Sequence, residues 1–496
     1  MRIIEIFLCA LCIASILMRI TNNRQTKKIN FISYIILIVF LVHLTFEGYR
    51  WQMICLYSFV TLNTLSLFFR NKSKVHSPIK KWIKSISGLF LIFSSIILGY
   101  YFPIFMLPQP TGKYDVGTFM LQINDNSRIE TFSDSKLMRK LIIQIWYPAD
   151  ITDKFIKSPL MIDENLMIGE FLDEYVRNKS LSFFFSDYFK YIKSNSYYGA
   201  DIIDTKGKFP LILISHGLGT SRILHTSQAE NLASHGYVVV CPDHTFGTAA
   251  TKFPDGEIAR FKMPIRYTNG WRDMNNSLNE YGKIWTEDLK FIIDEMFSFD
   301  PEKEGKHIKN RIDLSKIGVV GHSLGGGAAY EISHRDDRIT AGVDMDGSLF
   351  NTHKKNTLKK PFLFILSGIN VESKKAQKHL SMNEKQLKAY GVSKEEYEEY
   401  IESETSEIFL MEESITNSGI ILEIKETGHY NFTDLQAYAP NIIETLGLTG
   451  KTDISKNMKL LNHILLDFFN THLKFENGNI EKIIDENPQL KMHIQF

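Results

Sequence analysis

This chain of 496 residues lacks the patterns that mark several large classes of protein. Its 57 Lys and Arg residues almost balance its 56 Asp and Glu residues, and the net charge of +1 argues against a nucleic-acid partner or steering of acidic substrates. There is no zinc-type spacing of His and Cys, no phosphate-loop Gly-Lys-Ser/Thr motif and no dinucleotide fingerprint. The sequence therefore gives no indication of a metal, nucleotide or other cofactor.

Cysteine is also scarce, with four residues in the whole chain: Cys9, Cys12, Cys55 and Cys241. Three of them lie in apolar N-terminal segments and one in the body, so no disulfide framework can be built from them. Cys9 and Cys12 imitate a C-x-x-C motif. They belong to a run of membrane type, and we do not interpret them as a redox or metal site.

What is abundant is long apolar sequence near the N-terminus. Each of four runs has 16 to 19 residues, close to the ~20 that cross a bilayer as a helix. A signal peptide is the alternative for the first run, which carries Glu5, and packed core helices are the alternative for the whole set. We predict a transmembrane helical domain over residues 1–104 with about four spans: Ile3–Met18, Phe31–Phe46, Trp51–Phe69 and Ile86–Tyr101.

Loop charge predicts how these spans are oriented. The loops after the first and third runs are basic, whereas the second loop has only Arg50, beside Glu47. The positive-inside rule places the two basic loops in the cytoplasm, so the N-terminus and everything after Tyr101 lie outside. We therefore expect a multi-pass protein of the cell membrane with an extracytoplasmic body. His43, inside the second run, is interpreted as a hydrogen-bonded packing residue, with a site-lining role as the alternative.

Residues 105–496 alternate between short apolar runs and helical patterns. This alternation predicts an α/β domain with a mostly parallel sheet. Residues 155–200 are expected to form irregular helices, and residues 370–418 form an acidic insert that is either a solvated helix or a lid. The expected strands are Val116–Ile123, Leu137–Tyr147, Leu211–Ile214, Tyr237–Cys241, Ile317–Val320, Ile339–Met345, Phe362–Leu366 and Ile420–Ile424.

One stretch of the body has the form of a nucleophile elbow, namely Gly321-His322-Ser323-Leu324-Gly325-Gly326. It lies between an apolar strand and the start of a helix, as the G-x-S-x-G turn requires. The glycines are needed because the turn is too tight for Cβ atoms on either side of the serine. We predict that Ser323 is a catalytic nucleophile.

A serine hydroxyl needs a histidine base and a carboxylate that orients the base. Among the histidines after the elbow, His429 is the one that follows a late apolar run, with Gly428 before it. Asp344 and Asp346 both end the strand after the elbow helix and share one face of it. We favour Asp346 because it is nearer to the carboxyl end of that strand, and Asp344 remains the alternative.

The developing oxyanion needs two backbone N–H donors. One is expected from Leu324, which follows the nucleophile, and the other from the loop after an early strand. The segment Ser215-His216-Gly217-Leu218-Gly219 follows Leu211–Ile214 directly and makes Leu218 the candidate. This chemistry needs neither a metal nor an organic cofactor.

Taken together, these segments resemble the plasma-type platelet-activating factor acetylhydrolases. The resemblance rests on Pro210–Gly219, Leu232–Tyr237, the elbow, Asp346 four residues before Phe350, and Gly428-His429 followed by Asn431-Phe432, within residues 112–475. It implies an α/β-hydrolase fold and a calcium-independent Ser-His-Asp esterase that releases short or oxidised sn-2 acyl chains from phospholipids. The chain differs from the animal enzymes in its N-terminal spans and in its acidic 370–418 insert.

Three interpretations of function stay open from the sequence. The first is a membrane-anchored serine esterase with Ser323, Asp346 and His429 as its triad, acting on lipid esters at the membrane. The second is a general carboxylesterase or polyesterase on small or polymeric esters. The third is a non-catalytic membrane sensor or scaffold that kept the hydrolase fold. The sequence does not indicate an oligomeric state.

Overall fold

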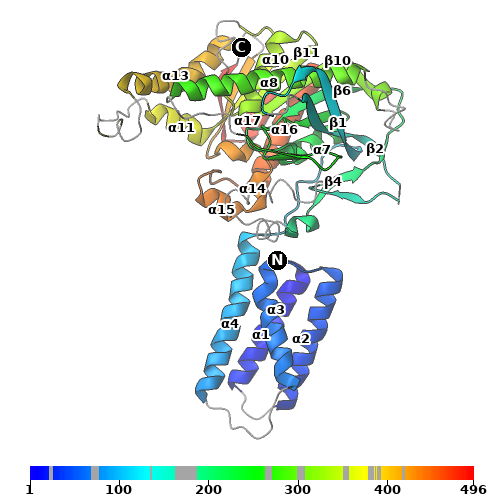
Figure 1. Ribbon diagram of the computed structural model, residues 1–496, viewed down its shortest axis with the longest axis vertical. Helices are drawn as coiled ribbons and strands as arrows, with labels where there is room; N and C mark the ends of the chain where they lie inside the picture. Colours follow the sequence, from blue (N-terminus) through cyan, green and yellow to red (C-terminus); the bar gives the residue numbers. More distant parts are fainter. Residues whose placement is uncertain are drawn as a thin grey trace.

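The computed structural model describes residues 1–21, 26–68, 78–133, 137–152, 154–161, 187–262, 271–298, 308–349, 357–377, 385, 387, 393–415 and 419–495. Figure 1 shows two parts that follow one another along the long axis, a bundle of four helices and an α/β body. The chain starts at the end of the bundle that faces the body, and α4 leads from the bundle into the body.

The helices of the bundle are α1 (Ile3–Thr21), α2 (Thr26–Phe46), α3 (Ile54–Phe68) and α4 (Pro78–Tyr101), with a short 3₁₀ turn η1 (Trp51–Met53) before α3. Three of them are long and apolar enough to cross a membrane: Ile3–Thr21, Lys28–Phe46 and Pro78–Tyr101. This corrects the expected count of four. Helix α3 falls short because its described part has 15 residues, and residues 69–77, where the expected span ends, lie outside the described residues.

A cluster of acidic, basic and polar side chains lies at the end of the bundle next to the body. Glu5 lies 2.9 Å from Arg50 and 2.8 Å from Arg2, while His43 contacts Glu47 at 2.9 Å. His43 Nε2 also lies 2.8 Å from the Tyr57 hydroxyl, which confirms a hydrogen-bonded packing histidine. Glu5, His43 and Glu47 are close enough to hold a metal ion, but the guanidinium groups of Arg2 and Arg50 already neutralise this pocket.

The body is built on a 12-stranded mixed sheet, in the order β14-β13-β12-β11-β10-β6-β7-β2-β1-β4-β3, with β5 paired to β2. Strands β6, β7, β10, β11, β12 and β13 pair in parallel, and β2, β1 and β14 extend the sheet in antiparallel fashion. Their bounds are β1 Asp115–Ile129, β2 Met138–Asp150, β3 Lys157–Pro159, β4 Lys193–Tyr198, β5 Asp201–Ile202, β6 Phe209–Ser215, β7 Val238–Asp243, β10 Ile312–His322, β11 Ile339–Met345, β12 Phe362–Ser367, β13 Gly419–Ile424 and β14 Leu490–Gln495. A separate hairpin pairs β8 (Ala250–Lys252) with β9 (Ile258–Arg260).

Helices cover both faces of this sheet, which is why its central strands are buried along their whole length. Trp285 of α8 and Ala328 of α10 pack on one face, while Leu232 of α7 and Leu461 of α16 pack on the other. The α-helices of the body are α7 Thr226–Ser234, α8 Trp271–Ser298, α10 Leu324–Arg335, α11 Gly368–Gln377, α13 Lys394–Ser414, α14 Leu435–Tyr438, α15 Pro440–Thr445, α16 Ile454–Leu473 and α17 Ile480–Glu486. The 3₁₀ turns are η2 Asp187–Tyr191, η3 Arg222–His225, η4 Lys309–Arg311 and η5 His429–Phe432.

Every expected strand is present, but the described residues of 155–200 form strands and one 3₁₀ turn in place of the expected irregular helices. This region contributes β3 and β4 to the sheet edge and one 3₁₀ turn, and residues 162–186 lie outside the described residues. In the acidic insert, helix α13 begins at a capping box, in which Ser393 accepts the Glu396 N–H at 3.1 Å. Met411 of α13 and Ile415 beside it pack in an apolar cluster with Phe364 that contains no candidate site residue.

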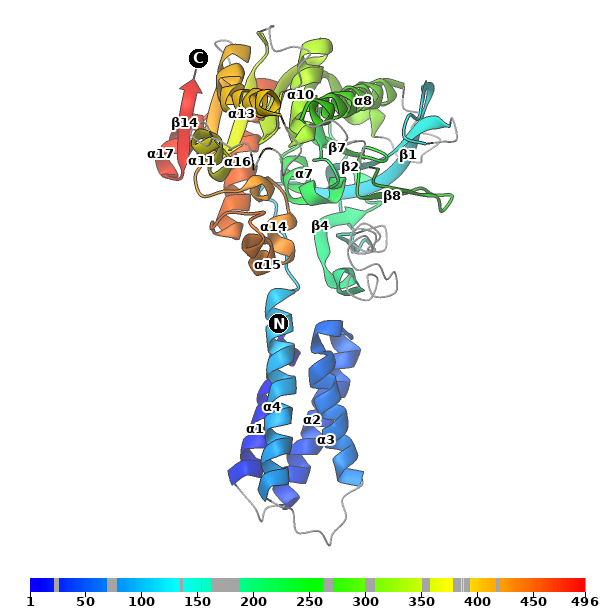
Figure 2. The same ribbon diagram turned by 60° about the vertical axis from the view of Figure 1, so that its left-hand side comes forward.

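The body is held against the bundle by side chains from both. The Tyr191 hydroxyl donates to the Tyr49 carbonyl at 2.6 Å, and the Arg2 guanidinium lies over the Tyr191 ring at 5.1 Å. Phe105, just after α4, stacks on Tyr438 of α14 at 4.9 Å. Helices α14 and α15 lie at the end of the body nearest the bundle (Figure 2).

Candidate active site

The nucleophile elbow forms as the glycine pattern predicts. Ser323 lies between β10 and α10 with φ 57° and ψ −126°, a strained conformation for a residue with a side chain. A Cβ on Gly321 would lie 2.0 Å from the Gly325 carbonyl oxygen, so this turn excludes any larger residue. The strand and helix are thereby forced close together, and Ser323 is partly exposed at the tip.

His429 and Asp346 meet at the same edge of the sheet. His429 opens η5 after β13, and its Nδ1 lies 2.7 Å from Asp346 Oδ2. A carboxylate in this position accepts a hydrogen bond from the Nδ1–H group, which leaves Nε2 unprotonated and able to act as a base. Asp346 has φ 56°, so the backbone turns sharply where β11 ends.

The Asp346 carboxylate is well supplied with donors. Besides His429, it accepts the Ser367 N–H at 2.8 Å, the Ser367 hydroxyl at 3.0 Å and the Asn370 side-chain amide at 2.6 Å. Burial alone would raise the pKa of Asp346, but the hydrogen bond and charge of His429 and the Ser367 bonds outweigh it and hold the pKa below its usual value. Asp346 is therefore ionised at neutral pH.

Asp344 lies elsewhere. Its Oδ1 accepts the Gly347 N–H at 2.7 Å, and a Cβ on Gly326 would lie 2.0 Å from the same atom. Asp344 is thus buried beneath the elbow helix, and the structure pairs His429 with Asp346 and not with Asp344. Asp346 was favoured because it lies nearer to the carboxyl end of β11. The structural reason that Asp346 reaches His429 is the sharp backbone turn at this residue.

The serine and histidine are neighbours but are not hydrogen-bonded to each other in this structure. His322, next to the nucleophile, lies 2.9 Å through Nε2 from the His429 carbonyl oxygen, and the two rings are 4.5 Å apart. The carbonyl accepts, so His322 Nε2 carries a proton and holds the histidine loop beside the elbow. Hydrogen bonds between nucleophile and base often tighten only when substrate is bound.

The two candidate oxyanion donors also lie beside the nucleophile. A Cβ on Gly217 would lie 3.2 Å from Ser323 Cβ, so the Gly217–Leu218 peptide is in contact with the elbow. Leu324 is the first residue of α10, where a helix has no internal partner for its N–H. Neither the Leu218 nor the Leu324 N–H donates to any residue that the structure describes.

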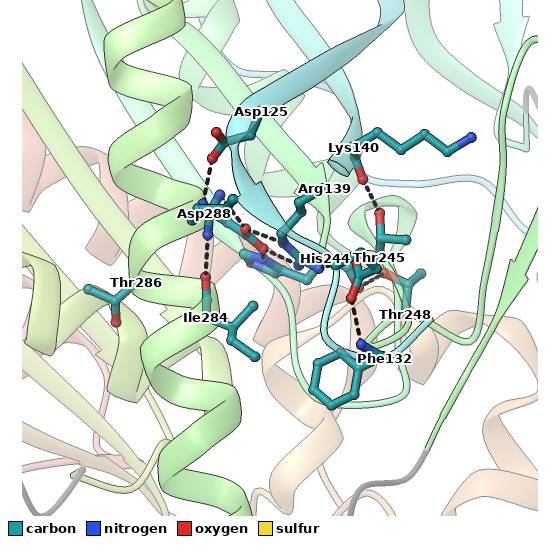
Figure 3. A network of polar contacts seen from close by, with 12 residues as sticks. Asp125, Phe132, Arg139, Lys140, His244, Thr245, Thr248, Ile284, Thr286 and Asp288 are labelled. Carbon is teal, nitrogen blue, oxygen red and sulfur yellow. Dashed lines mark hydrogen bonds and ion pairs between the residues drawn. The ribbon is translucent and has the colours of Figure 1, made fainter. Parts of the chain in front are cut away.

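Next to the loop after β6 lies a buried polar network that the sequence did not reveal (Figure 3). Asp288 of α8 lies between Arg139 of β2 and His244 after β7, at 2.5 Å and 2.9 Å. His244 Nε2 in turn lies 3.0 Å from Ser215 Oγ. The one available signal was Asp243-His244 at the end of an apolar run, where α/β sheets gather functional residues.

Comparisons with known proteins show the family of this chain. The family model for platelet-activating factor acetylhydrolase, isoform II, matches residues 101–263 and 285–488. A platelet-activating factor acetylhydrolase of Cavia porcellus is 26% identical over 292 residues, which are 55% of this chain and 59% of that protein. A probable 1-alkyl-2-acetylglycerophosphocholine esterase of Arthroderma benhamiae is 25% identical over 281 residues, which are 53% of this chain and 65% of that protein. The alignments thus span about three fifths of these relatives.

Among solved structures, a ferulic acid esterase from Streptomyces cinnamoneus superposes with a TM-score of 0.58 and 22% identity, covering 79% of this chain and 100% of that one. This similarity establishes the α/β-hydrolase fold of the body. The family model covers well over half of the chain. The chain therefore belongs to the platelet-activating factor acetylhydrolase, isoform II, family.

Proposed function

We propose that this member of the family is a membrane-anchored serine esterase that cleaves short or oxidised sn-2 acyl chains from phospholipids. Ser323 is the nucleophile, His429 the base and Asp346 the carboxylate that orients it. Leu218 and Leu324 donate their N–H groups to the oxyanion. The observation that carries the proposal is the 2.7 Å contact between His429 and Asp346 beside a serine on a strained elbow.

The reaction has two steps. His429 takes the Ser323 proton as the serine attacks the ester carbonyl, and the tetrahedral oxyanion is stabilised by the two amides. His429 then protonates the leaving alcohol, which leaves an acyl-serine. Water activated by the same histidine releases the acid. Asp346, kept ionised by its donors, stabilises the imidazolium in both steps.

The bundle supports a site next to the membrane. Helices α14 and α15 follow the His429 loop directly, and Tyr438 of α14 stacks on Phe105, which follows α4. The N-terminus and the start of the body lie at the same end of the bundle (Figure 1). Lys80, Lys81 and Lys84 lie in the first turns of α4, at the other end. This distribution supports spans over residues 1–104, a multi-pass topology and an extracytoplasmic body over residues 105–496.

A lipid panel tests the substrate class. Purified full-length chain and its Ser323→Ala variant would be assayed on phosphatidylcholines with acetyl, oxidised and long sn-2 chains, and on 4-nitrophenyl esters of matching length. We expect hydrolysis of the short and oxidised phospholipids by the wild type alone. Activity confined to the 4-nitrophenyl esters would indicate a general carboxylesterase. Inactivity of correctly folded protein on every ester would indicate a scaffold.

Reconstitution tests the role of the bundle. In vesicles, the full-length chain should hydrolyse a short-chain phosphatidylcholine in its own bilayer faster than the same lipid in separate vesicles, because tethering raises the local concentration. Equal rates for the two lipid pools would contradict a catalytic role of the tether.

Cysteine labelling tests the orientation. Ser315→Cys on the body and Lys80→Cys at the far end of the bundle are both exposed positions. In intact cells, an impermeant maleimide should react at position 315 and reach position 80 only after permeabilisation. The opposite pattern would place the body in the cytoplasm.

A further inference from the structure

The peptide unit between Gly217 and Leu218 is fixed by hydrogen bonds to its carbonyl oxygen. Three donors converge on the Gly217 oxygen: His216 Nδ1 at 2.7 Å, the Thr220 N–H at 3.1 Å and the Thr220 hydroxyl at 2.6 Å. The described chain has no cis peptide bond, and in a trans peptide the C=O and N–H point in opposite directions. Fixing the Gly217 carbonyl therefore fixes the direction of the Leu218 N–H.

The N–H on the other side of this unit is left free next to the nucleophile. A Cβ on Gly217 would lie 3.0 Å from His322 Nδ1 and 3.2 Å from Ser323 Cβ, so this peptide packs directly on the elbow. The Leu218 N–H donates to no residue within the described part of the chain. An oxyanion donor must be aimed before the reaction, because reorienting it during the reaction would cost part of the stabilisation.

The grip by His216 depends on which ring nitrogen carries its proton. His216 Nε2 accepts the backbone N–H of His244 at 3.2 Å and lies 3.0 Å from the Thr248 hydroxyl. Since Nε2 is an acceptor, the proton of the neutral ring is on Nδ1, where it can be donated to the Gly217 carbonyl. Burial lowers the pKa of His216 well below its usual value, so the ring stays neutral.

His244, which supplies that backbone N–H, is fixed in place by contacts of its own side chain. Its ring stacks on Trp285 at 4.2 Å and 7°, and its Nδ1 contacts Asp288 at 2.9 Å. Two bonds from Arg139, of 2.6 Å and 2.5 Å, fix the Asp288 carboxylate in turn (Figure 3). The loop after β7 is thus tied to α8 and β2, and Gly219 is bonded to that loop by its N–H at 2.8 Å from the Gly247 oxygen.

We propose that His216 is a positioning residue for the oxyanion hole: it aims the Leu218 N–H at the substrate through the Gly217 carbonyl, and the Arg139–Asp288–His244 network holds it in the required tautomer. The inference rests on the proposed function, because it assumes that Leu218 is an oxyanion donor. It adds a group of residues that touch neither substrate nor nucleophile but act on the transition state.

Two substitutions of His216 separate positioning from packing. In His216→Asn, the side-chain amide nitrogen occupies the place of Nδ1 and can donate to Gly217. In His216→Gln, the polar atoms reach only the place of Nε2, so the bond to His244 can be kept while the grip on Gly217 is lost. Both variants are smaller than or similar to His and disturb the same core.

Steady-state kinetics on 4-nitrophenyl acetate give the first readout. We expect His216→Gln to lower kcat about 10- to 100-fold with KM within about threefold, somewhat less than the ~100- to 1000-fold loss when a donor is removed outright. His216→Asn should recover most of that loss. A tetrahedral mimic, a trifluoromethyl ketone, should bind the Gln variant more weakly by the same factor as kcat falls.

Equal kcat values for the Asn and Gln variants, or a loss confined to KM, would overturn the proposal. If either variant fails to fold, Thr220→Val and Thr220→Ser provide a second pair, because only the Ser variant keeps the hydroxyl bond to Gly217. The Val variant should then lose kcat and the Ser variant should keep it. The small ester makes the result independent of whether phospholipid is the substrate, and a Ser323→Ala control shows separately whether the triad assignment fails.

Discussion

Two groups of serine, histidine and aspartate can be compared within the described part of the body. In the proposed triad, His429 Nδ1 lies 2.7 Å from Asp346, and the His429 side chain is 30% exposed. In the second, His244 Nδ1 lies 2.9 Å from Asp288, and both of these side chains are fully buried. The second relay is the more complete one, because Ser215 Oγ lies 3.0 Å from His244 Nε2 whereas Ser323 forms no such bond to His429.

The comparison teaches that a hydrogen-bonded Ser-His-Asp chain is not sufficient for catalysis. Ser215 ends a regular strand with no exposed surface, whereas Ser323 is raised on an elbow at φ 57°. The charges differ too. Asp288 is neutralised by Arg139, while Asp346 is bound by neutral donors and by His429, so its charge is left to stabilise an imidazolium. The proposed active site thus differs from the buried network in two ways: its serine is partly exposed, and its carboxylate has no guanidinium partner among the described residues.

Removing the exposed serine should have the largest effect. Ser323→Ala is expected to lower kcat on 4-nitrophenyl acetate by on the order of a millionfold, because it removes the attacking hydroxyl. A fluorophosphonate probe should label Ser323 of the wild type and should not label Ser215. Ser315→Ala, on an exposed position at the far end of β10, is the control and should keep full activity. Labelling of Ser215 would break the comparison.

Exchanging the carboxylates comes next. Asp346→Asn should lower kcat about ten-thousandfold, since the amide favours the wrong tautomer of His429. Asp344→Asn is the matched control two residues away. Because Asp344 bonds to Gly347 and not to His429, we expect it to lower the melting temperature while kcat of the folded protein stays within about tenfold. A reversed outcome would make Asp344 the catalytic acid.

The buried His244 leads us to expect that folding stability depends on pH. Burial lowers the pKa of His244, although its bond to Asp288 opposes the shift, so the folded protein holds this ring neutral while the unfolded chain binds a proton below about pH 6.5. Stability is therefore lost as pH falls below that value. We expect the advantage of wild type over His244→Asn in free energy of unfolding to shrink as the pH falls below about 6.5, by at most about 1.4 kcal/mol per pH unit.

Denaturant titrations of both proteins between pH 7 and pH 5 measure this difference. Parallel curves for wild type and variant would mean that His244 takes up its proton in the folded protein. In that case the buried His244 could not be distinguished from the partly exposed His429 by its protonation.

We expect the smallest effect from a substitution of the buried Ser215. Ser215→Ala removes the hydroxyl that donates to His244 Nε2 and should cost about 1–3 kcal/mol of folding stability, the usual cost of leaving one buried polar atom without a partner. Turnover should fall less than tenfold, because the backbone path through His216 is intact. Thermal unfolding and kcat of the same preparation test both parts, and a thousandfold loss of kcat would give Ser215 a direct catalytic role.

Much of the candidate site could be predicted because its signals are local. The elbow needs glycines at fixed offsets from Ser323, and His429 was singled out by an apolar run and a glycine before it. Asp344 and Asp346 could be ranked but not resolved, since both share a face of the strand and the choice depends on the turn after it. Ser367 and Asn370, which support Asp346, carry no sequence signal at all.

The membrane part divides in the same way. Apolar length predicted the spans, though it overcounted them by one among the described helices. It did not predict the ion pair of Glu5 with Arg50, because these two residues come from separate segments and meet only when the helices pack into a bundle.

By itself, the sequence determined the elements and the chemistry available at their ends: apolar helices, buried strands, a turn only glycine permits, and a loop that can offer an N–H. Only the tertiary structure decided which serine is exposed and which is sealed. Arg139 and Asp288 are 149 residues apart, and His244 and Asp288 are 44 apart, so sheet order and the packing of α8 bring them together. Local sterics act over a few residues, whereas burial and charge pairing depend on the whole packed domain.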